Sequence, residues 1–518
     1  MIAAPSNLWD GFAATAGAHG QAPALHLSHR TVTYGELAAL ASRCAAYLGT
    51  RGVGQGSVVA LQLSKRLEAY VLLLACLRLG APYLFVDPKN PPERTARMAE
   101  RVRPTLMVTT TVGSAGMCPT FELGDENASA WLSSLPDRTP PYSAVTGTDP
   151  AYIMFTSGST GEPKGAVIPH QGVLTLGTWA RRQSYAGPSE RLANVNPLHF
   201  DNSVFDVYGA LLNGASLIPV ETADLATPVA WLKALRSSGA TLLFAVPTFF
   251  LVLDQLGLLT PESLPSVRTF MFGGEGYPIG RLREFHARFA GRARLVNVYG
   301  PTETSCICAS TEIDADALDA PDSEFPPLGR MHENFSHAIL DDEHKPVASG
   351  EPGELWIGGP CVGLGYYGNP QEAATRFRQD PRQDRYRAVY YRSGDLVRED
   401  ERGLLWFHGR VDNQVKIRGH RIELEEVDLA VQSVPGVMRA LSVVIAAEAG
   451  DEIQVAFVAD RAVPASEINV LCSSKLPAYM RPGRVVQFAA LPSNANGKAD
   501  RRATKRLLEQ ASELASPP

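Results

Sequence analysis

Three short apolar segments set the strongest limit on how this chain can fold. They cover residues 242–247, 269–272 and 295–299, and each ends at a proline or a glycine, with helical stretches between them. Strand, helix and strand in this alternation predict parallel sheets with helices packed against them. In open sheets of this kind ligands bind beyond the carboxyl ends of the strands, so we expect functional residues just after these segments.

The same alternation occupies the first 150 residues. We predict a helix from Thr33 to about Leu48, strands at 56–61 and 82–86, and a helix between these two strands that ends at Leu79. From about residue 340 glycines separate hairpin-like segments, and a compact α+β unit runs to the end of the chain.

The predicted fold class is therefore α/β, in two domains. Residues 1–411 form a large N-terminal domain of parallel-rich sheets with flanking helices and a β-rich subdomain. Residues 412–518 form a small α+β C-terminal domain on a hinge.

Composition excludes several classes of protein. The 518 residues are 45% hydrophobic and 20% charged, which is the balance of a folded globular protein. The formal net charge of −6 argues against nucleic acid or a membrane surface as a partner. The longest apolar segment, 242–253, has 12 residues, whereas a membrane span needs about 20. Seven scattered cysteines and an N-terminus without a basic region predict a cytoplasmic protein without a signal peptide or zinc site.

A loop rich in glycine and hydroxyl groups follows the strand-like residues 151–155. Residues 156–165 read TSGSTGEPKG and offer hydroxyls, backbone N–H groups and the ammonium of Lys164, a set that suits a polyphosphate. A Walker A loop has Gly directly before its lysine and Ser or Thr after it, and Pro163 and Gly165 stand there instead. The structural alternative is a plain surface loop.

Nine further motifs accompany this loop along nearly the whole chain. They are VTYGEL (32–37), LGAPYLFVDPKNPPER (79–94), FDNS (200–203), NVYGPTET (297–304), GELWIGG (353–359), YRSGDL (391–396), GRVDNQVKIRGHRIELEEV (409–427), LPAYMRP (476–482) and NGKADR (496–501). In this order they resemble the adenylate-forming superfamily of acyl-CoA synthetases, luciferases and adenylation domains of nonribosomal peptide synthesis. The details are more similar to amino-acid-activating members, and MFGGE (271–275) resembles the D-alanine:carrier-protein ligases.

The resemblance implies a reaction in two steps. A carboxylate attacks the α-phosphorus of ATP and displaces pyrophosphate, and a carrier or CoA thiol then attacks the acyl adenylate. The first step depends on positioning and charge neutralisation. The resemblance implies ATP and Mg²⁺ as cofactors, with loop contacts to the phosphates from Thr156, Ser157, Gly158, Thr160 and Lys164.

The resemblance also distributes the remaining nucleotide contacts. It assigns the adenine to Asn297 and Tyr299, the α-phosphate to Thr302, the ribose to Asp395 with Arg410 nearby, and Mg²⁺ to Glu303. A carboxylate is the oxygen ligand that Mg²⁺ prefers beside phosphate. The structural alternatives are a turn residue at Asp395 and a helix-start carboxylate at Glu303.

Two lysines would serve the two steps. Lysine occurs only nine times among 48 basic residues, so a lysine in a glycine-rich motif suggests a selected point charge. By resemblance, Lys498 is the catalytic lysine of adenylate formation. Rotation of the C-terminal domain about Asp412 would replace it with Lys416 for thioester formation. For Lys416 an exposed strand face is the alternative.

Asp201 distinguishes among the possible acyl substrates. It precedes a helix in which Ser203 and Asp206 have the spacing of a capping box, so Asp201 is left for another role. In amino-acid-activating relatives the matching aspartate pairs with the substrate's α-ammonium, and a second helix cap is the structural alternative. His199 resembles the gating residue before this motif.

The residues expected to line the amino-acid pocket have large apolar walls and no further charge. By offset from the motifs they are Phe205, Phe244, Met271, Gly273, Val298, Cys306 and Ile307. Such a pocket predicts a small neutral amino acid. A small β-amino acid is also open, as is the choice between D and L.

The predicted partner is a separate, free-standing carrier protein. No Gly-x-x-Ser attachment site for phosphopantetheine follows residue 501. Two other functions stay open: an acyl- or aryl-CoA synthetase, against which Asp201 argues, and a catalytically silent binding module, against which the set of motif residues argues.

Overall fold

The computed structural model describes residues 5–110, 118–140, 144–158, 161–220, 227–319, 323–446, 450–492 and 500–513. The chain forms two compact units. The first comprises Met1–Pro88, Val102–Met154 and Gly165–Val411, and the second comprises Lys89–Arg101, Phe155–Lys164 and Asp412–Pro518. Segments 89–101 and 155–164, which the sequence analysis places in the N-terminal domain, thus group with C-terminal residues.

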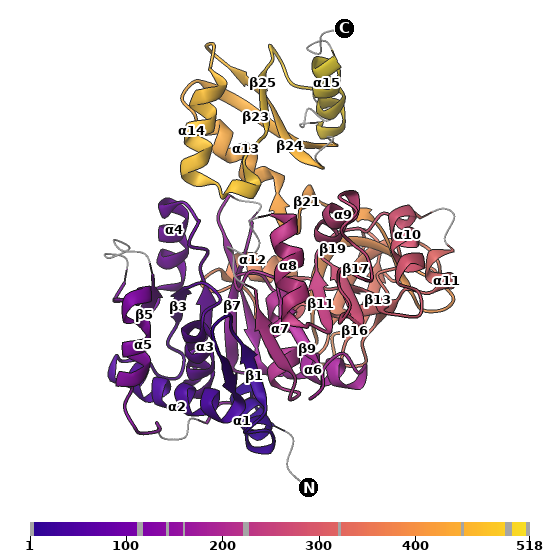
Figure 1. Cartoon of the computed structure of the whole chain (residues 1–518). Helices are drawn as coiled ribbons and strands as arrows, with labels where there is room; N and C mark the ends of the chain where they lie inside the picture. The colour runs from indigo at the N-terminus through magenta and orange to yellow at the C-terminus, as the bar shows by residue number, and fades with distance from the viewer. Residues whose placement is uncertain are drawn as a thin grey trace. The chain divides into compact units, whose positions relative to one another are not determined.

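A nine-stranded sheet is the largest element of the first unit (Figure 1). Its strands, in spatial order, are β15 (Arg330–Met331), β14 (Ala309–Glu312), β13 (Arg294–Tyr299), β12 (Thr269–Gly273), β11 (Leu242–Ala245), β9 (Arg191–Asn194), β10 (Ser216–Pro219), β1 (Pro23–His26) and β2 (Thr31–Thr33). The six central strands from β13 to β1 run parallel, and antiparallel strands close both edges.

Both faces of this sheet are buried, as parallel sheets require. Successive side chains of a strand point to opposite faces. Phe244 and Met271 therefore join one apolar cluster, whereas Leu243 and Phe270 join another on the opposite face. The helices of the unit are α1 (Leu8–Ala18), α2 (Tyr34–Thr50), α3 (Leu67–Leu79), α5 (Asp125–Ser134), α6 (His170–Arg182), α7 (Asn202–Leu211), α8 (Pro228–Ser238), α9 (Pro247–Gln255), α10 (Ile279–Phe289), α11 (Ala315–Leu318) and α12 (Pro370–Arg376).

Two further sheets complete this part of the chain. A six-stranded sheet contains β6 (Thr120–Glu122), β5 (Leu106–Thr109), β3 (Val59–Gln62), β4 (Tyr83–Phe85), β7 (Pro150–Thr156) and β8 (Lys164–Pro169). A five-stranded antiparallel sheet contains β16 (Ser336–Leu340), β17 (Gly353–Gly358), β19 (Val389–Glu399), β18 (Phe377–Gln379) and β20 (Leu405–Arg410).

The second unit has its own core. The hairpin of β21 (Gln414–Ile417) and β22 (His420–Glu423) precedes a three-stranded sheet of β23 (Val437–Ile445), β24 (Glu452–Ala459) and β25 (Arg484–Gln487). Helices α13 (Leu424–Gln432) and α14 (Ala465–Lys475) pack on one face with Val455 and Phe457, and α15 (Arg501–Glu513) packs on the other with Ala456 (Figure 1). Helix α4 (Pro92–Val102) belongs to this unit through residue 101.

The predicted α/β class is confirmed, and local signals explain several boundaries. The Thr33 hydroxyl accepts a hydrogen bond from the Glu36 N–H and caps α2. Gly80, with a φ of 67°, ends α3 in the left-handed conformation. None of the helices described here is long and apolar enough to cross a lipid bilayer.

Candidate active site

Strand register brings the predicted pocket residues of the sheet onto one face. Phe244 pairs with Met271 across β11 and β12, and Gly273 pairs with Val298 across β12 and β13. Phe205 of α7 packs on the same face, where its ring lies perpendicular to that of Phe244 at a centroid distance of 5.6 Å. The three strand ends and one helix thus form a single apolar wall.

Gly273 allows two of these strands to approach closely. A Cβ atom at this position would lie 2.4 Å from the Val298 carbonyl oxygen and 2.7 Å from Val298 Cγ2. Contacts under 3.0 Å require something to shift, and the nearer contact here is backbone. A side chain at 273 would therefore push the wall apart, which is a structural reason for the glycine.

The loop after β13 supplies the two remaining pocket residues, Cys306 and Ile307, both buried. It starts with the 3₁₀-helix η2 (Thr302–Thr304), and then both Ser305 (φ 62°) and Cys306 (φ 80°) adopt the left-handed conformation. Two such residues in succession store backbone strain, which the bond from Ser305 Oγ to the Cys361 carbonyl (2.9 Å) helps to hold. Burial, and then the charges of nearby aspartates, raise the pKa of the Cys306 thiol, so the thiol stays protonated and apolar.

Asp201 occupies the N-cap position of α7 but its side chain makes no capping hydrogen bond. Its Oδ2 atom instead accepts a hydrogen bond of 2.6 Å from the Thr302 hydroxyl. The partly buried carboxylate is thus held beside η2, in the loop that also carries the pocket residues. It is the kind of group that pairs with an ammonium ion.

The predicted capping box of Ser203 and Asp206 is wrong. The Ser203 hydroxyl donates to the Phe200 carbonyl at 2.7 Å, and Asp206 turns into the core, where it is fully buried. The spacing alone could not separate a cap from an inward position, because helical residues three apart share one face.

Asp206 is the centre of a buried polar network that the sequence did not reveal. Its Oδ2 atom accepts hydrogen bonds from the amides of Asn194 (2.9 Å) and Asn196 (3.0 Å), and Asn196 also donates to the Phe244 carbonyl at 2.9 Å. Within the described chain its Oδ1 atom is buried without a hydrogen-bond partner. Burial raises the pKa of Asp206 to about 7, against the lowering effect of its hydrogen bonds to Asn194 and Asn196. The network ties α7 to β9 and β11 behind the apolar wall.

His199 lies just before this helix. Its Nε2 atom is 3.6 Å from Asp87 Oδ2, and its ring contacts that of Phe200 at 4.7 Å between centroids. The gating role stays a prediction.

Three of the four predicted adenosine residues form one connected set in the first unit. The Tyr299 hydroxyl donates to Asp395 Oδ2 at 2.5 Å, and Arg410 forms an ion pair with Asp395 Oδ1. Asn297 donates to the Pro327 carbonyl at 2.7 Å. The strands β13, β19 and β20 therefore bring together Tyr299, Asp395 and Arg410, although they come from three separate motifs.

Glu303 is completely buried, and its partner is a residue that the sequence analysis did not select. The Tyr366 hydroxyl donates to Glu303 Oε1 at 2.8 Å, and the Gly363 N–H donates to the Glu303 carbonyl at 2.7 Å. Among the described residues no group of three or more His, Cys, Asp or Glu side chains forms a metal site. A cation here would therefore combine one carboxylate with phosphate oxygens and water, which is how Mg²⁺ is commonly bound.

The glycine-rich loop belongs to the second unit. Thr156 ends β7, and its hydroxyl is buried without a hydrogen-bond partner in the described structure. A Cβ atom on Gly158 would lie 2.0 Å from the Glu162 carbonyl, so only glycine fits this turn. Lys164 is 4% exposed at the start of β8. These groups fit a phosphate site, where a buried hydroxyl, bare backbone and an ammonium are all donors.

The remaining predicted residues of this unit stand as follows. Lys416 lies on β21 and is partly buried, and the Asp412 carboxylate accepts a hydrogen bond from the Gln414 N–H at 3.3 Å. Thr160 and Lys498 lie outside the described residues. The hinge and the two lysine roles stay predictions.

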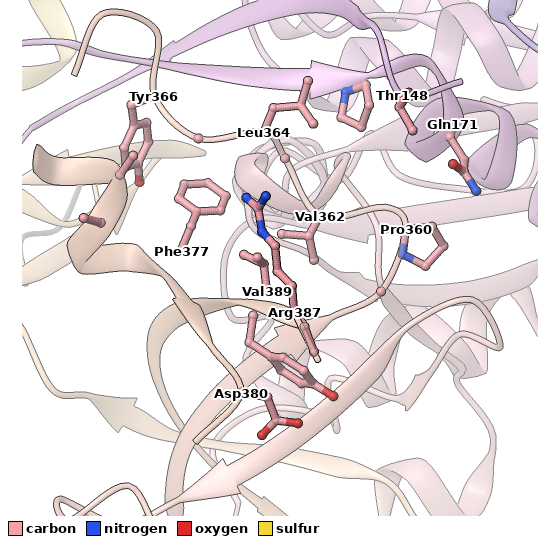
Figure 2. A pocket seen from close by; sticks show the side chains of 18 of the residues that line it. Thr148, Gln171, Pro360, Val362, Leu364, Tyr366, Phe377, Asp380, Arg387 and Val389 are labelled. Carbon is pink, nitrogen blue, oxygen red and sulfur yellow. The ribbon is translucent and has the colours of Figure 1, made fainter. Parts of the chain in front are cut away.

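The first unit also has a large open pocket, of about 1170 Å³. Figure 2 shows its lining, which includes Phe377, Val362 and the exposed side chain of Arg387. None of the predicted site residues that the structure describes lines it, although Tyr366 does. Its acid Asp380 forms an ion pair with Arg382.

Sequence comparison finds relatives over nearly the whole chain. It is 33% identical to the L-proline--[L-prolyl-carrier protein] ligase of Pseudomonas fluorescens (strain Pf-5), over 90% of this chain and 92% of that protein. It is 36% identical, over 92% of its length, to the malpibaldin synthetase of Mortierella alpina, of which it spans 9%. It spans 20% of the dimodular nonribosomal peptide synthase of Bacillus subtilis (strain 168), at 33% identity over 92% of this chain.

Comparison with solved structures also finds similar proteins over nearly the whole chain. IdnL1 superposes with a TM-score of 0.81 and 30% identity, over 95% of this chain and 100% of that one. Holo-PA1221, a nonribosomal peptide synthetase protein containing adenylation and PCP domains, gives a TM-score of 0.83 and 25% identity, over 97% and 84% of the two chains. The match to the model of the AMP-binding enzymes covers residues 12–367. By this match and by its relatives, the chain belongs to the family of AMP-binding enzymes.

Proposed function

We propose that this chain is an AMP-forming ligase that activates a small neutral amino acid and transfers it to the phosphopantetheine thiol of a separate carrier protein. The amino-acid carboxylate attacks the α-phosphorus of ATP, the bond to the β-phosphate bridging oxygen breaks, and pyrophosphate leaves. The carrier thiolate then attacks the aminoacyl carbonyl, and AMP leaves. Similarity over 92% of a proline:carrier-protein ligase supports the carrier as acceptor.

The placement of Asp201 carries the amino-acid part of the proposal. Its carboxylate is held by the Thr302 hydroxyl and is not used to cap α7. Thr302 is the residue assigned to the α-phosphate, so the ammonium site and the phosphorus that the carboxylate attacks are neighbours. A plain carboxylic acid would bring no ammonium to this carboxylate, so the favourable ion pair with the substrate would not form.

The pocket wall supports a small neutral side chain. Phe205, Phe244 and Met271 are fully buried and apolar, and Gly273 contributes no side chain of its own. A charged substrate side chain would find no partner on this wall. A small β-amino acid would satisfy the same contacts and is the second candidate.

Nucleotide contacts are proposed for the residues described above, with Asp395 accepting the ribose hydroxyls and the loop at 156–164 contacting the phosphates. When bound at Glu303, Mg²⁺ would neutralise charge on the phosphates. Tyr299 and Arg410 would hold Asp395 in place, and Tyr366 would do the same for Glu303. Lys498, assigned to the adenylation step, would give way to Lys416 after rotation about Asp412.

The deciding experiment is amino-acid-dependent ATP–pyrophosphate exchange across α-, β- and D-amino acids and plain carboxylic acids. The proposal expects exchange with a small neutral amino acid. Exchange only with an acid that lacks an amine would favour an acyl- or aryl-CoA synthetase, and exchange with no acid would favour a silent binding module.

A second experiment separates the two steps. Lys498→Ala should abolish most adenylate formation and spare transfer from a preformed aminoacyl adenylate to a carrier. An equal loss in both steps would contradict the exchange of Lys498 for Lys416.

A further inference from the structure

The glycine-rich loop is held by a short acidic segment of its own unit, Arg421–Glu426. Ser157 Oγ donates to the Arg421 carbonyl at 2.8 Å and accepts from the Glu423 N–H at 3.1 Å. The Gly158 N–H points at Glu426 Oε2 at 3.4 Å. A hydroxyl and an N–H that suit a phosphate are therefore bonded to the protein itself.

Glu426 is held in this position by an ion pair. Its side chain is 2% exposed and pairs with Arg94 of α4, which is 4% exposed. Removing one partner of a buried pair is strongly destabilising, so the pair fixes the Glu426 carboxylate beside the loop. The Gly158 N–H therefore contacts a carboxylate oxygen, as it would contact a phosphate oxygen.

Two further contacts fix this segment. The Gln414 amide donates to Glu423 Oε1 at 2.7 Å, so this carboxylate is bonded within the segment's own hairpin. Leu429, on the following helix, packs against the loop, since a Cβ atom on Gly161 would lie 3.0 Å from Leu429 Cδ1.

We infer that Arg421–Glu426 is an internal competitor of the ATP triphosphate, with the Glu426 carboxylate at Gly158 and the Arg421 carbonyl at Ser157 occupying donors that phosphate oxygens would use. ATP then has to displace this segment before these donors can bind its phosphates. The inference rests on the proposed function, which assigns ATP to this loop.

One hydrogen-bond donor of the loop does not bond to the acidic segment. The buried Thr156 hydroxyl has no hydrogen-bond partner in the described chain. A buried hydroxyl without a partner is unfavourable and is normally paired in the working state of a protein. An incoming phosphate would satisfy it, which favours displacement of the acidic segment by ATP.

The test is direct binding of ATP, without amino acid, to the full chain and to two charge variants. Glu426→Gln removes the competing charge at Gly158 and should tighten ATP binding about three- to tenfold by calorimetry. Glu425→Gln is the matched control: it removes the same charge from the same segment, but its described contacts are to Asn413 and Arg501. Its ATP affinity should equal that of the wild type.

The outcomes separate the two hypotheses. If the wild type binds ATP and the folded Glu426→Gln variant binds it no more tightly, the competitor is overturned and the proposed function stands. No ATP binding to the wild type would overturn the proposed function itself. If Glu426→Gln fails to fold because Arg94 loses its partner, hydrogen exchange of the wild type carries the test alone.

Amide hydrogen exchange gives a second test, because a purely structural role of this segment predicts no change in exchange rate when ATP is added. Adding ATP should speed exchange of the Glu423 amide, because the Ser157 hydroxyl that accepts its hydrogen bond leaves. Exchange that stays unchanged or slows at saturating ATP would contradict displacement.

Discussion

The apolar wall of the first unit and the glycine-rich loop of the second differ in how their polar groups are hydrogen-bonded. Behind the wall, the Asn194 and Asn196 amides both donate to Asp206 Oδ2 within the framework of α7, β9 and β11. In the loop, Ser157 and Gly158 are bonded to residues more than 260 positions away along the chain. Both sets of hydrogen bonds form without a substrate. Only those of the loop use donors that are also assigned to a substrate, the phosphates of ATP.

Under the proposed function, this difference would separate how the two substrates are recognised. A wall made of strand ends and a buried network has no alternative hydrogen-bond partners, so it would select the amino acid by shape. The loop donors are bonded to the protein and are also assigned to phosphate, so the loop would recognise phosphate by exchanging partners. The following variants test whether the contacts of the wall are fixed and those of the loop exchangeable.

The largest effect should come from Asp201→Asn. This change keeps the shape and the hydrogen bond from Thr302 but removes the charge for the ammonium. The KM for the amino acid in pyrophosphate exchange should rise at least about 30-fold, since losing one partner of an enclosed charge pair costs about 2 kcal/mol or more. The KM for ATP, measured in parallel, should stay within about twofold. An equal rise in both KM values would show that Asp201 also contributes to nucleotide binding, which would contradict the contrast between the wall and the loop.

Gly273→Ala tests whether the wall is fixed. The added Cβ would meet the Val298 carbonyl at 2.4 Å, and a wall that cannot open should lose about 1–3 kcal/mol. The exchange rate with the preferred amino acid should fall about tenfold. Gly280→Ala is the matched control, because it lies in α10 with no atom within 4 Å of its added Cβ. Full activity of Gly273→Ala would show that the strands separate easily.

Tyr366→Phe removes one hydrogen bond from the buried Glu303. A bond to a charged group contributes about 1.5–3 kcal/mol, so the Mg²⁺ concentration for half-maximal exchange should shift several-fold. Tyr277→Phe is the control, since the Tyr277 hydroxyl is buried and has no described hydrogen-bond partner. If both variants behave like the wild type, Tyr366 does not position Glu303.

The last prediction concerns stability and not activity: a pH dependence of unfolding at Asp206. Its pKa is about 7 in the folded state and near 3.8 when exposed, so the folded state binds the proton more tightly. Its contribution is therefore present in full at low pH and is lost as the pH rises towards 7, by at most about 1.4 kcal/mol per pH unit. The advantage of the wild type over Asp206→Asn in thermal melting should be larger at pH 5 than at pH 7.5. A constant difference would mean that Asp206 is ionised throughout.

Local structure was readable from the chain where the pattern was strong. The segments predicted as strands at 242–247, 269–272 and 295–299 are β11, β12 and β13, within one to two residues at each end. The helix predicted from Thr33 to about Leu48 is α2, which ends at Thr50. Apolar runs bounded by Pro or Gly determine such elements almost alone.

Long-range partners were not readable in the same way. No local pattern shows that Ser157 bonds to β22 or that Tyr366 reaches Glu303, because both depend on how distant segments pack. Asp206 was misplaced for a related reason: its spacing from Ser203 fits a cap, and only the asparagines of β9 and the residues after it draw it into the core. Buried polar networks lack a sequence period, whereas apolar faces have one.

The left-handed pair Ser305–Cys306 has a consequence for redesign of the pocket. A residue at 306 must accept a φ of 80°, which β-branched side chains such as Val, Ile and Thr tolerate poorly. Libraries that randomise this position should therefore return few folded clones, enriched in Gly, Asn, Asp and other small residues. Ile307 and Phe205, which have ordinary backbone geometry, are the positions where a new side-chain volume can be introduced without that penalty.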